Sequence, residues 1–263
     1  MKLAIYGAGG RMGKVIARLV AQADDLSIVG AVDAASHPHL GRDVGELAGV
    51  GPLGVELSAD LGSALLGAEM VIDFSVAAVF DEMLRGAIKA GLPVVSGTTM
   101  LSDASQALLA RAAETIAVLW APNMSLGVQV LARLVEQAVA ALPGYDVELC
   151  ETHHGRKIDA PSGTATMLVD RAVAARRDLQ DRVHGRQGEV GQRRPTEVGV
   201  HALRGGGVVG DHSLHLLGPF DRLEITHRAM SRDLFAEGAL RAARFLLGRS
   251  PGRYDLADLL DAS

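Results

Sequence analysis

A glycine-rich turn near the N-terminus constrains the fold of this chain more than any other feature. Residues 3–6 read as a short buried strand, and the apolar side chains after Lys14 recur at helical spacing. Between them, Gly7 permits a tight turn, Gly9 or Gly10 lets the backbone approach a pyrophosphate, and Gly13 allows close packing of the helix. A strand, a glycine turn and a helix in this order predict a dinucleotide-binding unit.

The next strand strengthens this prediction. Residues 26–32 resemble a strand that ends in Asp33, twenty residues beyond Gly13, where a carboxylate can hold the ribose hydroxyls of a dinucleotide. Met12 stands at the position of the third glycine in the usual G-x-G-x-x-G pattern, and Gly13 follows one place later. The glycine pattern alone is weak evidence, and its context between two strands gives it its weight.

Strands and helices alternate through the first half of the chain. Strand-like runs occur at residues 70–74, 93–96 and 117–120, with helical patterns at 77–90 and 102–114. Alternation of this kind predicts a parallel sheet, whose ligands lie beyond the carboxyl ends of the strands. The segments at these ends, which we expect to contact a cofactor, are Phe74-Ser75, Gly97-Thr98-Thr99 and Ala121-Pro122-Asn123-Met124. Any one of them alone is better explained as a turn, but the three together favour a binding role.

The pattern changes after Met124. The predicted elements are a helix at 126–141, a strand at 145–151, a helix from Ser162, a polar mobile loop at 176–195, strands at 197–204, 208–217 and 221–228, a helix at 234–247 and a tail at 256–260. Consecutive strands without helices indicate a mostly antiparallel sheet. We therefore predict a Rossmann-like α/β dinucleotide-binding domain, residues 1–124 and 233–263, and an α+β domain, residues 125–232, with a mostly antiparallel or mixed open sheet.

The run from Glu151 to Ala165 carries the predicted chemistry, because it concentrates titratable groups on the connection between a strand and a helix. Pro161 precedes Ser162, a good N-cap, so the amides of Gly163 and Thr164 are expected to be free donors at a helix N-terminus, which is an anion site. Lys157 adds a mobile positive charge, and His153 adds a group that changes protonation near neutral pH. The run predicts proton transfer to a carboxylate or phosphate substrate.

Composition excludes several other classes. The chain has 263 residues, 48% of them hydrophobic, enough for a large core split over two domains. A net charge of −5 and 3% aromatic residues argue against nucleic acid as a partner. No apolar run reaches the roughly 20 residues that span a bilayer, and a first strand beginning at Lys2 leaves no room for a signal peptide, so we expect a cytoplasmic protein. The single cysteine, Cys150, is expected to be a small buried residue.

The remaining histidines allow other interpretations. His153 and His154 with Asp159 or Glu151 are compatible with a metal site, but adjacent residues on an extended chain point to opposite faces, and we predict no metal. Glu151 is expected to be structural and to accept a hydrogen bond that orients one histidine. The histidines expected to be surface or packing residues are His201, His212, His215 and His227.

Taken together, these residues resemble the 4-hydroxy-tetrahydrodipicolinate (dihydrodipicolinate) reductase family of lysine and diaminopimelate biosynthesis. The resemblance covers nearly the whole chain and is most specific in the run at 151–165. It is supported by Gly-Ala-Gly-Gly-Arg-Met-Gly at 7–13, Gly97-Thr98-Thr99, Ala121-Pro122-Asn123 and Leu223-Glu224-Ile225-Thr226-His227. The chain departs from the family at Ser75-Val76 and at Met100, both beside the expected cofactor site.

The resemblance implies roles for individual residues. His153 is the general acid/base and Lys157 the second proton donor. The residues implied to bind a small dicarboxylate are His154, Lys157, Ser162, Gly163, Thr164 and Arg232. Those implied to bind the nicotinamide cofactor are Gly7, Ala8, Gly9, Gly10, Arg11, Met12, Asp33, Gly97, Thr98, Thr99, Ala121, Pro122, Asn123 and Met124. The family also implies a homotetramer assembled through the second-domain sheets, and use of both NADH and NADPH.

The residues around Asp33 predict a preference between the cofactors. Its carboxylate favours NADH and repels a 2′-phosphate, the next three residues supply no arginine, and Arg11 is the only nearby cation evident from sequence. We expect NADH to be preferred and NADPH to remain usable. Because the cofactor and the substrate are expected in different domains, we also expect the domains to close about junctions near 124 and 232. Two alternatives stay open: a nicotinamide-dependent reductase of another small carboxylic acid, and a noncatalytic nucleotide-binding regulator.

Overall fold

The computed structural model describes residues 1–262 and separates them into two compact units. The first unit comprises residues 1–124 and the chain from Arg232 onward, and the second comprises Ser125–Ser231. Arg232, which the sequence places at the end of the second domain, thus belongs to the first unit. In the part of the chain that the structure describes, no helix is long and apolar enough to cross a membrane.

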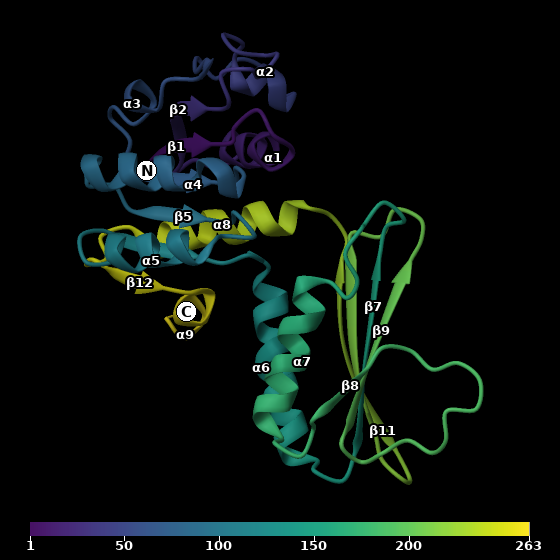
Figure 1. The fold of residues 1–263 in the computed structure, drawn as a ribbon. Coiled ribbons are helices and arrows are strands. Elements are labelled where there is room, and N and C mark those ends of the chain that lie inside the picture. The colour runs from purple at the N-terminus through teal and green to yellow at the C-terminus, as the bar shows by residue number, and fades with distance from the viewer. Residues whose placement is uncertain (263) are drawn as a thin grey trace. The chain divides into compact units, whose positions relative to one another are not determined.

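The first unit is built on a seven-stranded sheet in the order β12-β6-β5-β4-β1-β2-β3, in which every neighbouring pair is parallel (Figure 1). Its strands are β1 (Lys2–Tyr6), β2 (Ser27–Val32), β3 (Leu57–Ser58), β4 (Met70–Asp73), β5 (Val94–Ser96), β6 (Ala117–Trp120) and β12 (Gly252–Tyr254). Its helices are α1 (Arg11–Val20), α2 (Val44–Ala48), α3 (Leu61–Ala64), α4 (Ala77–Ala90), α5 (Asp103–Ala112), α8 (Asp233–Leu246) and α9 (Leu256–Asp261). The predicted Rossmann-like parallel sheet is confirmed.

Apolar spacing explains the helices of this unit. In α4 the fully buried residues Phe80, Met83, Leu84 and Ala87 recur every three or four positions and form one stripe against the core. Gly91 ends the helix in the left-handed region at φ 67°, where glycine has no steric cost. Sequence reasoning missed α2, α3, β3 and β12 because each has six residues or fewer, too few to show a period.

The second unit is built on a five-stranded sheet in the order β11-β10-β7-β9-β8. Its strands are β7 (Asp146–His153), β8 (Asp181–Val183), β9 (Glu197–Arg204), β10 (Gly210–Leu217) and β11 (Arg222–Ala229), and its helices are α6 (Leu126–Ala141) and α7 (Gly163–Ala175). The helices lie side by side on one face of the sheet (Figure 1), where residues such as Val135, Leu149 and Leu168 form a second core.

Of the two forms predicted for this sheet, the mixed one is confirmed, and two other predictions about this unit need correction. Strand β10 pairs antiparallel with β7 and β11, while β9 runs parallel to both β7 and β8. A crossover through α7 and the polar segment after it makes β7 and β9 parallel. Strand β7 extends to His153, since this residue pairs with Arg204 of β9, so His153 lies on the strand and not on the connection. Cys150 is half-buried and not fully buried.

The polar segment 176–195, predicted as a mobile loop, is anchored to the sheet. It contains β8, and Arg186 and Arg193 both donate to the Glu148 carboxylate, at 2.9 and 3.0 Å for the shorter contacts. His201 Nε2 lies 2.6 Å from the same carboxylate. Gly199 provides the space, because a Cβ there would lie 1.7 Å from Glu148 Oε2. Charged residues that suggest a loop in the sequence therefore form an ion-pair cluster in the fold.

This cluster predicts acid-sensitive stability. Burial alone would raise the pKa of Glu148, but hydrogen bonds from Arg186, His201 and Arg193 lower it from 4.5 to about 2. A pKa lowered by folding stabilises the protein above pH 4.5, and this stabilisation is lost as the pH falls toward 2. We expect Glu148→Gln to lower the free energy of unfolding by about 2 kcal/mol at pH 7, with a smaller difference from wild type near pH 2 to 3.

Urea unfolding from pH 7 to 2.5 measures this effect. Glu237→Gln, which removes an exposed helix carboxylate with 56% side-chain exposure, is the control and should change stability little. A Glu148→Gln difference that does not depend on pH would show that the cluster stabilises the fold by packing and not by charge.

Candidate active site

The glycine turn of the first unit has the open space of a phosphate-binding loop and leads into a helix without a side-chain cap. Gly7 has φ +80°, and a Cβ on it would lie 2.8 Å from Phe74 O. A Cβ on Gly13 would lie 2.4 Å from Gly7 O and 2.5 Å from Ala8 Cα, so α1 can approach the turn only because Gly13 has no side chain. Gly10 caps α1 without any side-chain hydrogen bond, which leaves the helix N-terminus to an external anion. Arg11 is the first helical residue and is exposed.

Asp33 lies beside this turn. Its Oδ2 accepts a hydrogen bond from Gly9 N at 2.9 Å, and its Oδ1 accepts one from Ala34 N at 2.8 Å. The ring of His37 also lies here, since a Cβ on Gly9 would be 2.6 Å from His37 Nε2 and 3.0 Å from Asp33 Oδ2. Sequence reasoning missed His37, because the fold of residues 33–40 brings this ring back over Gly9.

The other predicted cofactor segments follow strands that are neighbours in the sheet. Strands β1, β4, β5 and β6 are parallel and adjacent, so Gly7, Ser75, Gly97 and Ala121 follow their strands at one edge of the sheet. The structure therefore brings together at this edge the residues predicted to contact the cofactor in the first half of the chain. Ala8, Met12, Thr99, Pro122 and Asn123 belong to the same segments.

Asp73 ties two of these segments together and was missed from the sequence. Its carboxylate is fully buried and accepts hydrogen bonds from Ser75 Oγ at 2.6 Å, Ser96 Oγ at 2.6 Å and Thr98 Oγ1 at 2.8 Å. The Thr98 hydroxyl is thus directed to Asp73. Met124, 1% exposed, is a core residue whose carbonyl faces Gly238. At 1% exposure each, neither Thr98 nor Met124 presents its side chain to a ligand in this structure.

In the second unit, His153 lies at the end of β7 with its ring held from one side. Glu151 Oε2 lies 2.6 Å from His153 Nδ1, because residues two apart on a strand share a face. Gly210 makes room on the other side of the ring, since a Cβ there would lie 2.9 Å from His153 Nε2. The predicted role of Glu151 in orienting a histidine agrees with this geometry.

The start of α7 adjoins His153. Ser162 caps the helix, with its Oγ accepting from Ala165 N at 3.2 Å, while its own N–H donates to Glu151 Oε1 at 3.0 Å. Gly163, the first residue of the helix, is exposed. Thr164, whose amide the sequence predicts as free, has an interaction within the chain. The predicted N-cap is confirmed.

Lys157 lies in the turn after His154, with its N–H donating to His154 O at 3.0 Å. Its ammonium is 2.9 Å from Asp159 Oδ1, and this hydrogen bond lowers the pKa of Asp159. Among residues 1–262 no group of three or more histidine, cysteine, aspartate or glutamate side chains is arranged to hold a metal ion. Asp159 here serves as the partner of a cation.

His212, predicted to be a surface or packing residue, packs against His153. It is 3% exposed, its Nε2 lies 3.1 Å from Ser162 Oγ, and its ring meets that of His153 edge-on at 5.3 Å between centroids. Burial lowers the pKa of His212 to about 4, so this ring is neutral at physiological pH. Two further residues at the site, Arg204 and His212, come from strands far along the sequence. Only their positions opposite β7 in the sheet identify them.

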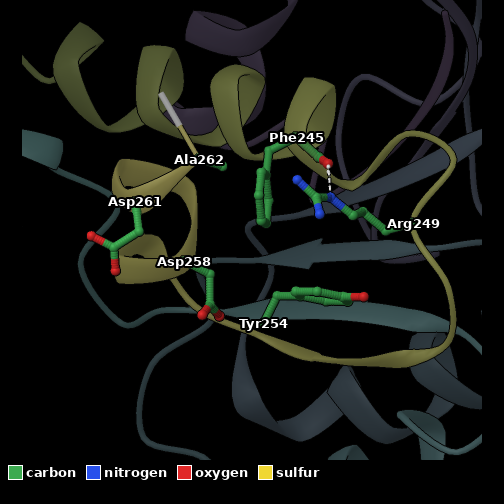
Figure 2. Close-up of a pocket in the computed structure, with 6 residues that line it drawn as sticks. All are labelled: Phe245, Arg249, Tyr254, Asp258, Asp261 and Ala262. Atoms are coloured by element: carbon green, nitrogen blue, oxygen red, sulfur yellow. Dashed lines mark hydrogen bonds between the residues drawn. The ribbon is translucent and has the colours of Figure 1, made fainter.

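Arg232 belongs to a different unit from His153 and Lys157. It is the N-cap residue of α8 in the first unit, whereas His153 and Lys157 belong to the second. A separate cavity of about 260 Å³ lies between α8, β12 and α9 (Figure 2). There the guanidinium of Arg249 stacks over Phe245 at 4.3 Å and Tyr254 packs against the same ring. None of the predicted site residues lines this cavity, which we assign to packing of the C-terminal segment.

The first unit has a glycine turn, a helix N-terminus without a side-chain cap and a carboxylate beside the turn. The second has a histidine and a lysine beside a capped helix. These features indicate a dinucleotide-binding oxidoreductase. Family models support a narrower assignment: "Dihydrodipicolinate reductase, N-terminus" matches residues 1–124 and "Dihydrodipicolinate reductase, C-terminus" matches residues 127–260. The chain belongs to the dihydrodipicolinate reductase family.

Individual relatives agree with this assignment. The chain is 45% identical over 263 residues to the 4-hydroxy-tetrahydrodipicolinate reductase of Nitrosomonas europaea, covering 99% of this chain and 98% of that one. It is 46% identical to the enzyme of the same name from an Anaeromyxobacter species, covering 99% and 97%. Among solved structures, dipicolinate-bound dihydrodipicolinate reductase from a Paenisporosarcina species matches with a TM-score of 0.78 and 21% identity over 97% of both chains, which supports the fold.

Proposed function

We propose that this protein reduces 4-hydroxy-tetrahydrodipicolinate to tetrahydrodipicolinate, with loss of water and oxidation of NADH or NADPH, in the cytoplasmic synthesis of diaminopimelate and lysine. The observation that carries the proposal is His153, fixed at Nδ1 by Glu151 and adjacent to the Ser162-capped start of α7. In our proposal His153 is a proton donor next to an anion site, and both lie within one unit of a reductase-family chain. A noncatalytic nucleotide sensor has no use for that combination.

The first unit fits the cofactor. Gly7 and Gly13 leave no room for side chains, α1 begins without a side-chain cap, and Asp33 lies beside Gly9. These features suit a pyrophosphate at the helix N-terminus and a ribose at the carboxylate. The nicotinamide cofactor supplies the hydride when it is bound; the protein contributes placement and charge.

The second unit supplies the proton and holds the substrate. Loss of water from the hydroxylated ring leaves an α,β-unsaturated imine, and negative charge develops on this ring as it accepts the hydride. In our proposal His153 or Lys157 delivers the proton that neutralises this charge. Lys157, His154, Gly163, Thr164 and Arg232 hold the two carboxylates, so that orientation contributes to the rate. Lys157 must exchange its bond to Asp159 for a bond to substrate.

A single assay tests the proposed function. Purified protein is mixed with NADH or NADPH, with and without freshly generated 4-hydroxy-tetrahydrodipicolinate, and cofactor absorbance is followed. We expect oxidation only with this substrate present. Oxidation with a different small carboxylic acid alone would favour the other reductase class, and cofactor binding without turnover would favour a regulator.

We also propose a homotetramer through the sheet of the second unit, whose helices cover one face only. The mass of the particle in solution tests this.

Arg232 provides a test of substrate recognition. Pyridine-2,6-dicarboxylate, a planar dicarboxylate, is expected to inhibit competitively against substrate, and Arg232→Ala is expected to weaken this inhibition about tenfold because a charged hydrogen bond is lost. Inhibition constants measure the effect. Arg241→Ala, an exposed arginine on the same helix, should leave inhibition unchanged. Equal inhibition of wild type and Arg232→Ala would place Arg232 outside the site.

Cofactor choice gives a second prediction. Asp33 is expected to favour NADH over NADPH, because a 2′-phosphate would lie near its carboxylate, while Arg11 supports residual use of NADPH. Arg11→Ala should therefore lose several-fold more catalytic efficiency with NADPH than with NADH, at about 1 kcal/mol for an exposed charge contact. The exposed Arg111 on α5 provides the control substitution. A wild-type preference for NADPH would contradict the role given to Asp33.

A further inference from the structure

The carboxylate of Glu151 in the second unit contacts three groups at the proposed catalytic site. Glu151 is 0% exposed, and its Oε2 lies 2.6 Å from His153 Nδ1 while its Oε1 accepts from Ser162 N at 3.0 Å. Arg204 donates to both oxygens, at 2.9 Å to Oε2 and 2.8 Å to Oε1. His153, the N-cap residue Ser162 and the partly buried Arg204 thus share a single anion.

The paired charges explain how this carboxylate can be buried. An ionised carboxylate without a partner is very costly in the interior, and a bidentate guanidinium is its best-matched partner. Burial alone would raise the pKa of Glu151, but hydrogen bonds from Arg204 and His153 outweigh it and lower this pKa. The hydrogen bond to Glu151 likewise raises the pKa of Arg204. Glu151 is therefore an anion at neutral pH.

The anion determines the orientation of the catalytic ring. A carboxylate only accepts hydrogen bonds, so the proton on His153 Nδ1 is donated to Glu151. The other ring nitrogen, Nε2, is then the atom that can face the substrate. Arg204 also donates to Asp159 O at 2.7 Å, which ties the segment carrying Lys157 to the same centre. His153 and Arg204 are direct cross-strand neighbours of β7 and β9, so the arrangement is built into the register of the sheet.

We propose that Glu151 and Arg204 act together as positioning residues: Glu151 fixes the tautomer of His153 and holds the start of α7 beside it, and Arg204 offsets the negative charge so that the proton on His153 stays transferable. This inference rests on the proposed function for its kinetic consequences. Its structural content, the orientation and charge balance of His153, does not depend on which small acid is reduced.

Charged or titratable groups face His153 from each element around it. On its own strand this is Glu151, on β9 Arg204, on β10 the buried His212, and on the following loop the ion pair of Lys157 with Asp159. His212 is neutral at physiological pH, and Lys157 and Asp159 balance each other. Glu151 and Arg204 therefore dominate the balance of charge on the ring.

The proposal predicts opposite effects of two substitutions on the pH profile. Glu151→Gln removes the anion, so protonated His153 is less favoured and the alkaline limb of the turnover profile should move to lower pH. Arg204→Gln leaves the anion unbalanced, so the limb should move to higher pH. Both should reduce turnover about tenfold to hundredfold, whereas Arg204→Lys, which keeps the charge, should leave the limb in place and restore part of the turnover.

The experiment measures turnover from pH 5.5 to 10, the binding of pyridine-2,6-dicarboxylate by calorimetry, and the histidine ring signals of isotope-labelled protein, with the His153 signal assigned through His153→Ala. Arg222→Gln is the matched control, since Arg222 is an arginine of the same sheet with 71% side-chain exposure. The ring signals should show Nδ1 protonated in wild type, and the titration midpoint of His153 should move in the same directions as the kinetic limb.

The outcomes are distinct. Shifts in the same direction for both variants, or an unchanged profile with only a lower melting temperature, would overturn the proposal and leave a structural ion pair. If Arg204→Gln does not fold, the shift in the nearly isosteric Glu151→Gln and the absence of a shift in Arg204→Lys decide the question. No turnover of 4-hydroxy-tetrahydrodipicolinate by wild type would refute the proposed function, while the ring signals would still test the positioning role.

Discussion

Replacing His153 with alanine is expected to reduce turnover about a hundredfold or more, the loss typical when a general acid or base is removed, while the affinity for NADH stays nearly unchanged. The reason lies in the separation of tasks between the units: the glycine turn and Asp33 belong to the first, and His153 belongs to the second. Lys157→Ala should have a similar effect on turnover and should also raise KM, because in our proposal the ammonium binds a carboxylate as well.

Steady-state kinetics and cofactor titration measure the two effects separately. His215→Ala is the matched histidine control, since His215 lies on the same sheet but contacts Glu224, and Lys89→Ala is the lysine control from α4. Both controls should retain wild-type turnover. A His153→Ala enzyme with near-normal turnover would remove His153 from the mechanism, whatever the family of the chain.

Gly13→Ala is expected to have the second large effect, this time on the cofactor. A Cβ at Gly13 would lie 2.4 to 2.5 Å from backbone atoms of Gly7 and Ala8, and backbone atoms cannot move aside as the end of a flexible side chain can. The start of α1 must then shift away from the turn, at a cost of about 3 kcal/mol, and a loss of this size corresponds to roughly a hundredfold weaker cofactor binding.

Fluorescence titration with NADH measures the change in affinity, and circular dichroism during heating measures stability in the same samples. Gly62→Ala is the control, because Gly62 lies in the short helix α3 and its Cβ would meet only the movable Asp60 side chain, at 3.3 Å. If Gly13→Ala binds NADH as wild type does, the glycine turn is not the pyrophosphate site.

Two kinds of residue show how far sequence reasoning extends in this protein. Local signals identified Gly7, Gly13, Asp33 and Ser162 because each acts through its own backbone segment, as a turn, a strand end or a helix cap. Asp73, Arg204, His212 and His37 carried no such signal. Each of them acts on a group brought to it by sheet register or by the return of a loop, and a linear pattern does not contain that information.

The sequence by itself determined the alternating α/β architecture of the first unit and the position of the reactive run at 151–165, because periodicity and capping are properties of neighbouring residues. The tertiary structure alone decided that β9 lies parallel to β7, and therefore that Arg204 faces Glu151 and His153. Strand pairing brings together residues more than fifty positions apart, so the charge balance around the proposed proton donor is a property of the folded sheet. The chain order alone does not specify it.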